Sequence, residues 1–160
     1  MLFLAFGGLC LIGGATAFGG TRLVWNASAS APIGLYALTG RDTGLGDLAL
    51  VRTPQSVRTL AAMRGYLPAN VPMVKRIAAA DGDIVCARSD QILINAKPVA
   101  TRRKQDSDRR PLPSWSGCRK LAQDEVFLLM AQVPDSFDGR YFGPTLRAAI
   151  IGKLVPLWTE

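Results

Sequence analysis

The N-terminal stretch constrains this chain most, because residues 2–20 are apolar or small throughout and Arg22 carries the first charged side chain. At about 1.5 Å per residue, a helix of this length just crosses a hydrocarbon core of roughly 30 Å. A cleaved signal peptide is the alternative, since Ala15-Thr16-Ala17 resembles a cleavage site. The apolar region of such a peptide is usually shorter and follows basic residues. We therefore expect residues 1–21 to form one transmembrane helix (an anchor or an uncleaved signal) before a single domain over residues 22–160.

The composition limits both the chemistry and the partners. The chain has no His, which excludes a Ser-His-Asp triad, a Cys-His dyad and a His-based zinc site. Three Cys cannot form a four-cysteine metal site, so we expect no metal and no cofactor. The formal net charge of +7 favours an acidic partner, either nucleic acid or anionic lipid headgroups.

The pattern after the apolar stretch is that of a β-rich domain. Short apolar runs between turn residues predict strands at residues 35–38, 47–52, 73–77, 84–87, 92–94, 97–99, 126–130 and 150–158. Apolar residues at helical spacing predict one short surface helix over residues 55–63, ended by Gly65. Many short strands with turns between them favour a closed or folded-over sheet.

A polar, basic stretch interrupts this pattern at residues 101–119. Its arginines could bind nucleic acid through phosphates. However, no groove-reading helix accompanies them, and Trp115 is the only aromatic residue nearby. We expect an exposed loop that faces solvent or an anionic membrane surface, and no nucleic-acid partner.

The cysteines and the charges leave the compartment open. Cys10 lies in the apolar stretch, while Cys86 and Cys118 lie 32 residues apart in the expected domain. This spacing fits a structural disulfide or two buried free thiols equally well. All Lys and Arg follow the apolar stretch, but long domains cross the membrane largely regardless of charge.

A chain without His needs another general base, and Lys75 is the best candidate. Burial disfavours the charged form of a lysine and so lowers its pKa. Lys75 lies in an apolar, strand-like segment, where alternation places it on the side of Met73 and Ile77. A snorkelling surface lysine is the alternative interpretation.

The candidate nucleophile lies a few residues after the apolar stretch. Residues 26–36 read NASASAPIGLY, a turn of small residues that leads into a strand. The small alanines leave the backbone open to a second extended chain. Serines in such a stretch are usually turn formers, so this feature alone is weak.

Three boxes in order carry a resemblance: SAPIGLY from Ser30, VKRIAAADGD from Val74 and DSFDGRYFGP from Asp135. Together they resemble the type I signal peptidase superfamily, and most closely its conjugative-transfer branch, the TraF-type pilin-processing peptidases. The resemblance spans almost the whole chain. It implies a mainly β, folded-over sheet with a small barrel-like core and one or two short helices.

The resemblance also implies the roles of individual residues. It makes Ser30 the nucleophile, Lys75 the general base and Asp138 a further catalytic residue. Ser28 and the backbone N–H of Ser30 would form the oxyanion hole. Supporting roles would fall to Ser136, Arg140 and Arg76, with Ser136 orienting the lysine amine. An ordinary surface ion pair is the alternative for Asp138 and Arg140. The expected walls of a pocket for small substrate residues are Ala31, Met73 and Val74.

The function implied is that of a membrane-anchored serine endopeptidase with a Ser-Lys dyad. It would cleave, or cleave and cyclise, a pilin or other exported precursor for conjugative transfer or type IV secretion. The catalytic domain would lie on the periplasmic side of the bacterial cytoplasmic membrane, which favours a disulfide between Cys86 and Cys118. Two alternatives remain: a general type I signal peptidase for secretory preproteins, and a basic, membrane-tethered assembly factor without enzymatic activity.

Overall fold

The structure is a computed structural model that describes residues 22–40 and 42–160. The expected anchor, residues 1–21, lies outside the described residues, so the division into anchor and catalytic domain stays a prediction. Within the described ranges, the helices are too short or too polar to span a bilayer.

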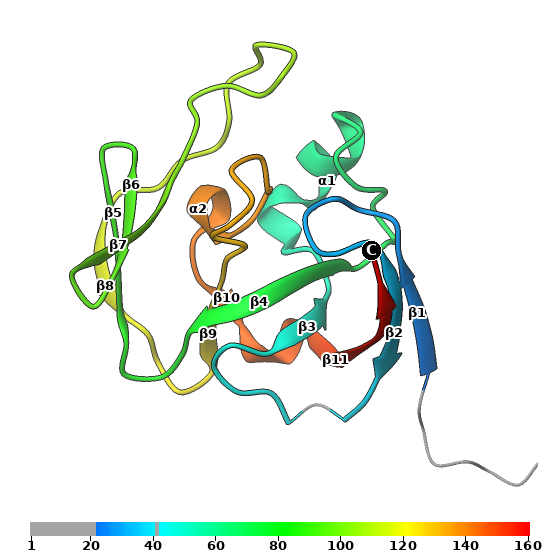
Figure 1. Cartoon of the computed structure of the whole chain (residues 1–160). Helices are drawn as coiled ribbons and strands as arrows, with labels where there is room; N and C mark the ends of the chain where they lie inside the picture. The colour runs from blue at the N-terminus through cyan, green and yellow to red at the C-terminus, as the bar shows by residue number, and fades with distance from the viewer. Residues whose placement is uncertain (1–21, 41) are drawn as a thin grey trace, which may run out of the picture.

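The described chain folds into two antiparallel sheets (Figure 1). The larger sheet has seven strands in the order β1-β2-β11-β3-β4-β9-β10. Its strands are β1 (Arg22–Asn26), β2 (Gly34–Leu38), β3 (Leu48–Val51), β4 (Met73–Ala79), β9 (Glu125–Leu128), β10 (Thr145–Leu146) and β11 (Ile150–Thr159).

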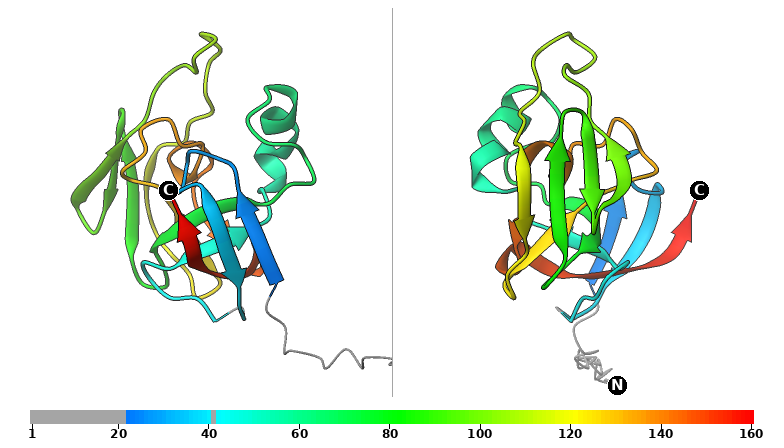
Figure 2. Two further views of the ribbon diagram at one scale, coloured as in Figure 1. Left: turned by 45° about the vertical axis from the view of Figure 1, so that its right-hand side comes forward. Right: turned by 90° about the vertical axis from the view of Figure 1, so that its left-hand side faces the viewer.

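The smaller sheet has four strands in the order β7-β6-β5-β8 and lies to one side of the larger one (Figures 1 and 2). Its strands are β5 (Ile84–Arg88), β6 (Gln91–Ile94), β7 (Lys97–Thr101) and β8 (Gly117–Lys120). The helical elements are α1 (Gln55–Met63), α2 (Gly139–Phe142) and the 3-10 turn η1 (Arg147–Ala149).

The mainly β fold class with few short helices is confirmed, but the expectation of a barrel-like core is wrong. Among the described strands, β1 and β10 end the larger sheet without pairing with each other, so the sheet folds over without closing. One physical reason is the length of β10, which has two residues and pairs only with β9. The long strand β11 instead bridges β2 and β3 and so bends the sheet.

The elements expected from the sequence are present, and others appear beside them. The helix α1 has the expected bounds, and every expected strand overlaps a strand of the structure. The strand β8 was not expected, because all of its residues are exposed and no apolar alternation marks it. The stretch expected to be an exposed loop therefore contains a strand, and part of the remainder forms hydrogen bonds with other parts of the chain.

The strand β4 is buried on both of its faces near its start. Val74 belongs to a hydrophobic cluster with Ala31, Tyr36 and Met130. Met73 and Ile77 belong to a second cluster on the other side of the strand. Lys75 lies between these two residues, so its side chain emerges in a strand with almost no access to water.

A disulfide joins Cys86 of β5 to Cys118 of β8, which face each other in the register of the smaller sheet. The alternative of two free thiols is therefore wrong. The bridge fixes the exposed strand β8 to the buried strand β5, and with it one end of the basic stretch.

We predict that Gly34→Ala lowers the free energy of unfolding by about 2–4 kcal/mol. Gly34 has a φ of +154°, and an added Cβ would overlap the carbonyl oxygen of Trp158 and lie 2.8 Å from the Cα of Thr159. The measurement is chemical denaturation of the full-length protein in detergent. The control is Gly44→Ala, whose Cβ would meet only an Asp47 oxygen at 3.9 Å. Equal losses in both variants would contradict the prediction.

Candidate active site

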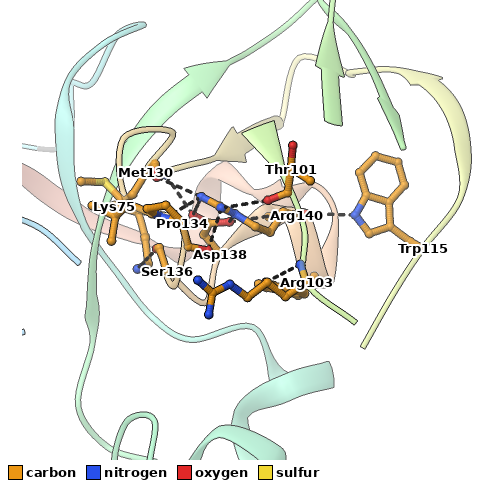
Figure 3. Close-up of polar contacts among 12 residues, drawn as sticks. Lys75, Thr101, Arg103, Trp115, Met130, Pro134, Ser136, Asp138 and Arg140 are labelled. Atoms are coloured by element: carbon orange, nitrogen blue, oxygen red, sulfur yellow. Dashed lines mark hydrogen bonds and ion pairs between the residues drawn. The ribbon is translucent and has the colours of Figure 1, made fainter. Parts of the chain in front are cut away.

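The side chain of Lys75 is 3% exposed and ends in a buried hydrogen bond (Figure 3). Its Nζ donates to the Oγ of Ser136 at 2.9 Å. The two neighbours on its side of the strand, Met73 and Ile77, share one hydrophobic cluster, which confirms the expected alternation. A snorkelling surface lysine is excluded by this burial.

Burial lowers the pKa of Lys75 from 10.5 to about 8. The negative charge of Asp138 opposes this shift, and the positive charge of Arg140 adds to it. A pKa near 8 leaves a substantial fraction of the amine neutral around pH 7 to 8, which a general base requires.

Asp138 is fully buried and acts as the N-cap of α2. Its Oδ2 accepts the backbone N–H of Met130 at 2.9 Å, and its Oδ1 accepts the Nε of Arg140 at 2.8 Å. Among the hydrogen bonds of the described residues, none joins Asp138 to Lys75. The carboxylate therefore acts on the amine through its charge and through the shape of the loop around Ser136.

Arg140 is 1% exposed and holds that loop from the other side (Figure 3). Besides Asp138, its guanidinium donates to the carbonyl oxygens of Met130, Val133, Pro134 and Thr101. The alternative of a surface ion pair is therefore wrong. Removing one partner of a buried pair typically costs about 3–5 kcal/mol, so this pair is a rigid support for the loop.

Asn26, at the end of β1, organises the turn that carries Ser30. Its Nδ2 donates to the carbonyl oxygens of Ser28 at 2.9 Å, Ala31 at 3.1 Å and Pro32 at 3.0 Å. Its Oδ1 accepts the backbone N–H of Ser28. This role was not expected, although an Asn before a small-residue turn is a known signal of such bonding.

Ser28 and Ser30 contact each other at this turn. Their hydroxyl oxygens lie 2.9 Å apart, and the backbone N–H of Ser30 donates to the Oγ of Ser28 at 3.3 Å. The two expected oxyanion donors therefore lie side by side, but one is engaged with the other. In this arrangement the N–H of Ser30 is directed at the hydroxyl of Ser28.

The turn and the strand of Lys75 meet through their neighbouring residues. Ala31 packs in one cluster with Val74 and Met130. No hydrogen bond joins Ser30 to Lys75 in the part of the chain that the structure describes. Catalytic hydrogen bonds are often long in substrate-free enzymes and shorten in the complex.

The remaining expected residues are Arg76 and the three expected pocket walls. Arg76 is exposed and donates to the carbonyl of Gly46, which fits a structural role. Ala31 and Val74 share a cluster, whereas Met73 packs in the other one and does not join them in a common wall. In residues 22–40 and 42–160, no group of His, Cys, Asp or Glu is arranged to hold a metal ion.

The model of the family described as signal peptidase, peptidase S26, matches residues 1–158. The chain belongs to this family. It is 35% identical to a plasmid transfer protein TraF of Escherichia coli over 170 residues, which cover 98% of this chain and 94% of that protein. A probable conjugal transfer protein TraF of Sinorhizobium fredii is 31% identical over 145 residues, or 84% of this chain and 75% of that protein.

These relatives confirm the resemblance to the TraF-type signal peptidases. Among solved structures, a signal peptidase I from Enterococcus faecalis aligns with a TM-score of 0.43 and 18% identity. The alignment covers 73% of this chain and all of that one.

We predict that Lys75→Met raises the free energy of unfolding at pH 7 by about 1–3 kcal/mol, because it removes a buried charge. Below pH 8 the Lys75 amine is protonated in both the folded and the unfolded wild type, so the folded protein bears the full free-energy cost of burying this charge. Between pH 8 and 10.5 the unfolded chain binds more protons than the folded one, and the wild type gains stability as the pH rises.

The measurement is denaturation of both proteins across this pH range, with Lys153→Met as the control. Lys153 forms a partly exposed ion pair with Asp47. Removing the Lys153 amine should not raise the free energy of unfolding at pH 7. A difference in the free energy of unfolding between wild type and Lys75→Met that stays constant from pH 7 to 10.5 would contradict the prediction.

Proposed function

We propose that the chain is a membrane-anchored serine endopeptidase that cleaves a pilin or other exported precursor during conjugative transfer or type IV secretion. Ser30 is the nucleophile and Lys75 the general base. The observation that carries the proposal is the buried amine of Lys75, which donates to Ser136 and has a pKa lowered by burial. Family membership supports the peptidase activity, and the names of the TraF relatives support the link to conjugation.

The first half of the reaction forms an acyl-enzyme. The neutral amine of Lys75 takes the proton of Ser30 as the Oγ attacks the scissile carbonyl. The backbone N–H of Ser30 and the hydroxyl of Ser28 stabilise the resulting oxyanion, a contribution typically worth about 3–4 kcal/mol per donor. The lysine ammonium then gives its proton to the leaving amine, and an ester on Ser30 remains.

The second half releases the product. Lys75, neutral again, activates either a water molecule or an amine that attacks the ester. Water gives a linear product with a free carboxylate. The N-terminal amine of the precursor would instead give a cyclic product with a new amide bond. In both routes, Ser136 orients the amine, while Asp138 and Arg140 hold the loop in place.

The substrate would bind as an extended strand beside the turn of Ser30 and the start of β4. Ala31 and Val74 lie in one cluster there, and their small side chains suit a small substrate residue next to the scissile bond.

An exposed apolar face of the larger sheet supports work at the membrane surface. The register aligns Trp25 of β1 with Leu35 of β2 and Trp158 of β11. The two Trp rings stack at 5.9 Å and are 57% and 52% exposed. Leu23, on the same face, is 64% exposed. In the proposed arrangement this face lies in the membrane interface, with the catalytic domain on the periplasmic side.

We predict that the full-length protein in detergent cleaves a conjugative pilin precursor and that Ser30→Ala and Lys75→Met each lose activity by about 10³-fold or more. Ser28→Ala should lose about 10²-fold in activity, as expected for one oxyanion donor.

The value of kcat/KM of the wild type should rise with pH through about 8, where Lys75 becomes neutral. The matched control is Ser56→Ala, an exposed serine of α1.

The same assay separates the alternatives. Mass spectrometry of the product distinguishes a linear chain from a cyclic one, which is lighter by one water. Preferred cleavage of an ordinary secretory precursor would instead indicate a general signal peptidase. Equal processing of the precursor in the presence of wild type, Ser30→Ala and Lys75→Met would contradict the enzymatic function and favour the assembly factor.

We predict that lipids brominated in their acyl chains quench the fluorescence of Trp25 and Trp158 in proteoliposomes. The measurement uses variants that keep one tryptophan, with the others changed to Phe. Trp115 is the internal control, because it packs on Phe127 and donates to the carbonyl of Gly139. Equal quenching of all three tryptophans, or none at all, would contradict a membrane contact by this face.

A further inference from the structure

The basic stretch between β7 and β8 has no part in the proposed mechanism, yet it contacts the segment that holds Ser136. We call residues 102–116 the arm. It rises from the smaller sheet and folds back on itself, with a bridge between Gln105 and Pro111 (Figure 2). Its tip is bound to the residues that follow α1, and its base is bound to α2.

The tip of the arm is fixed by Asp106, whose side chain is 7% exposed. Its Oδ2 accepts the hydroxyl of Tyr66 and the Nε of Arg110, the latter at 2.7 Å. The guanidinium of Arg110 also lies over the Tyr66 ring, 5.7 Å from its centroid. A second bond runs from Arg64 to the carbonyl of Pro111 at 2.7 Å. These contacts hold Tyr66 in one orientation.

The ring of Tyr66 packs against Phe137, with the centroids 5.2 Å apart. Phe137 also stacks on Tyr141 at 5.7 Å and meets Phe142 edge-on at 5.8 Å. Phe137 stands between Ser136 and Asp138 in the chain, so the position of its ring bears directly on both.

One member of this aromatic group packs on the side of β4 from which Lys75 emerges. Phe142 packs on the cluster that contains Met73 and Ile77, the two residues that flank Lys75. Leu67, next to Tyr66, packs on this cluster as well. Through Tyr66 and Phe137, the arm is thus linked to the residues that pack on this side of β4.

The base of the arm is attached independently of its tip. Trp115 donates to the carbonyl of Gly139 at 2.9 Å, and the backbone N–H of Arg103 donates to the hydroxyl of Tyr141 at 3.1 Å (Figure 3). The disulfide between Cys86 and Cys118 fixes the strand that follows. A change at the tip can therefore loosen Tyr66 while the base of the arm and α2 keep their contacts.

We propose that the tip of the arm positions Phe137 through Asp106 and Tyr66, and so keeps the Lys75 amine dry and bonded to Ser136. Asp106, Tyr66 and Phe137 are positioning residues, since none of them touches the reacting atoms. The inference rests on the proposed function only in treating Lys75 as the general base. We call the contact of Asp106 with Tyr66 the latch. Its loss would admit water to the Lys75 amine and favour the charged form of that amine.

The test compares Asp106→Asn with Asp108→Asn in the full-length protein in detergent. The two aspartates lie in the same arm and both pair with Arg110, but the side chain of Asp108 is 66% exposed and does not contact Tyr66. Phe137→Leu is the second variant, because it keeps an apolar side chain and removes the ring contacts. The charged groups that act on Lys75, Asp138 and Arg140, are unchanged in all three.

Two readouts are measured. Labelling with trace acetic anhydride at a series of pH values, followed by mass spectrometry of the peptide with Lys75, gives the pKa of this amine without any substrate. The pH profile of kcat/KM on the precursor gives the same ionisation through the reaction. We expect Asp106→Asn and Phe137→Leu to raise the pKa by at least about half a unit, which lowers the neutral fraction about threefold near pH 7.5. Activity should recover at pH 10, and Asp108→Asn should match wild type.

The outcomes are distinguishable. A raised pKa in the labelling experiment without the matching change in the rate profile would support the latch and overturn Lys75 as the base. An unchanged pKa in Asp106→Asn and Phe137→Leu would overturn the latch, whether their activity falls evenly across the pH range or stays at the level of wild type.

Discussion

The buried amine of Lys75 is the constraint on which the rest of the site depends. An ammonium group removed from water is costly, and a lysine in such a place shifts its pKa instead. The amine has an acceptor in Ser136 and almost no access to solvent. A protein that needs a base but contains no His can obtain one in this way. The requirement is then a segment rigid enough to keep water out.

The hydrogen bonding around Asp138 and Arg140 meets that requirement. These two residues neutralise each other inside the protein, and they also form hydrogen bonds with the backbone of residues 130–134 and of Thr101. Their charges act on Lys75 in opposite directions, so the effect of burial dominates. The pair thus rigidifies the loop, while its two charges largely cancel in their effect on the pKa of the amine.

The sequence predicts those parts of the fold whose signal is local. The bounds of α1 follow from Val57, Leu60 and Ala61 at helical spacing, and the orientation of Lys75 follows from alternation with Met73 and Ile77. The roles of Ser30 and Asp138 come instead from the resemblance, whereas Lys75 was already the candidate base because the chain has no His; all three roles remain proposals. Contacts between distant residues left no local signal: Tyr66 and Asp106 lie 40 residues apart, and β8 is exposed throughout. Closure of the sheet could not be read from the sequence either, since it depends on whether its two end strands meet.

The most direct test of the central claim is an NMR titration of the full-length protein with ¹³C-labelled lysine ε-carbons, in which the resonance of Lys75 is assigned by its absence in Lys75→Met. A midpoint near pH 8, well below that of the exposed lysines, is the result that a buried, neutral base requires. A midpoint near 10.5 would mean that the amine keeps its charge at physiological pH, and Lys75 could not then serve Ser30 as a base.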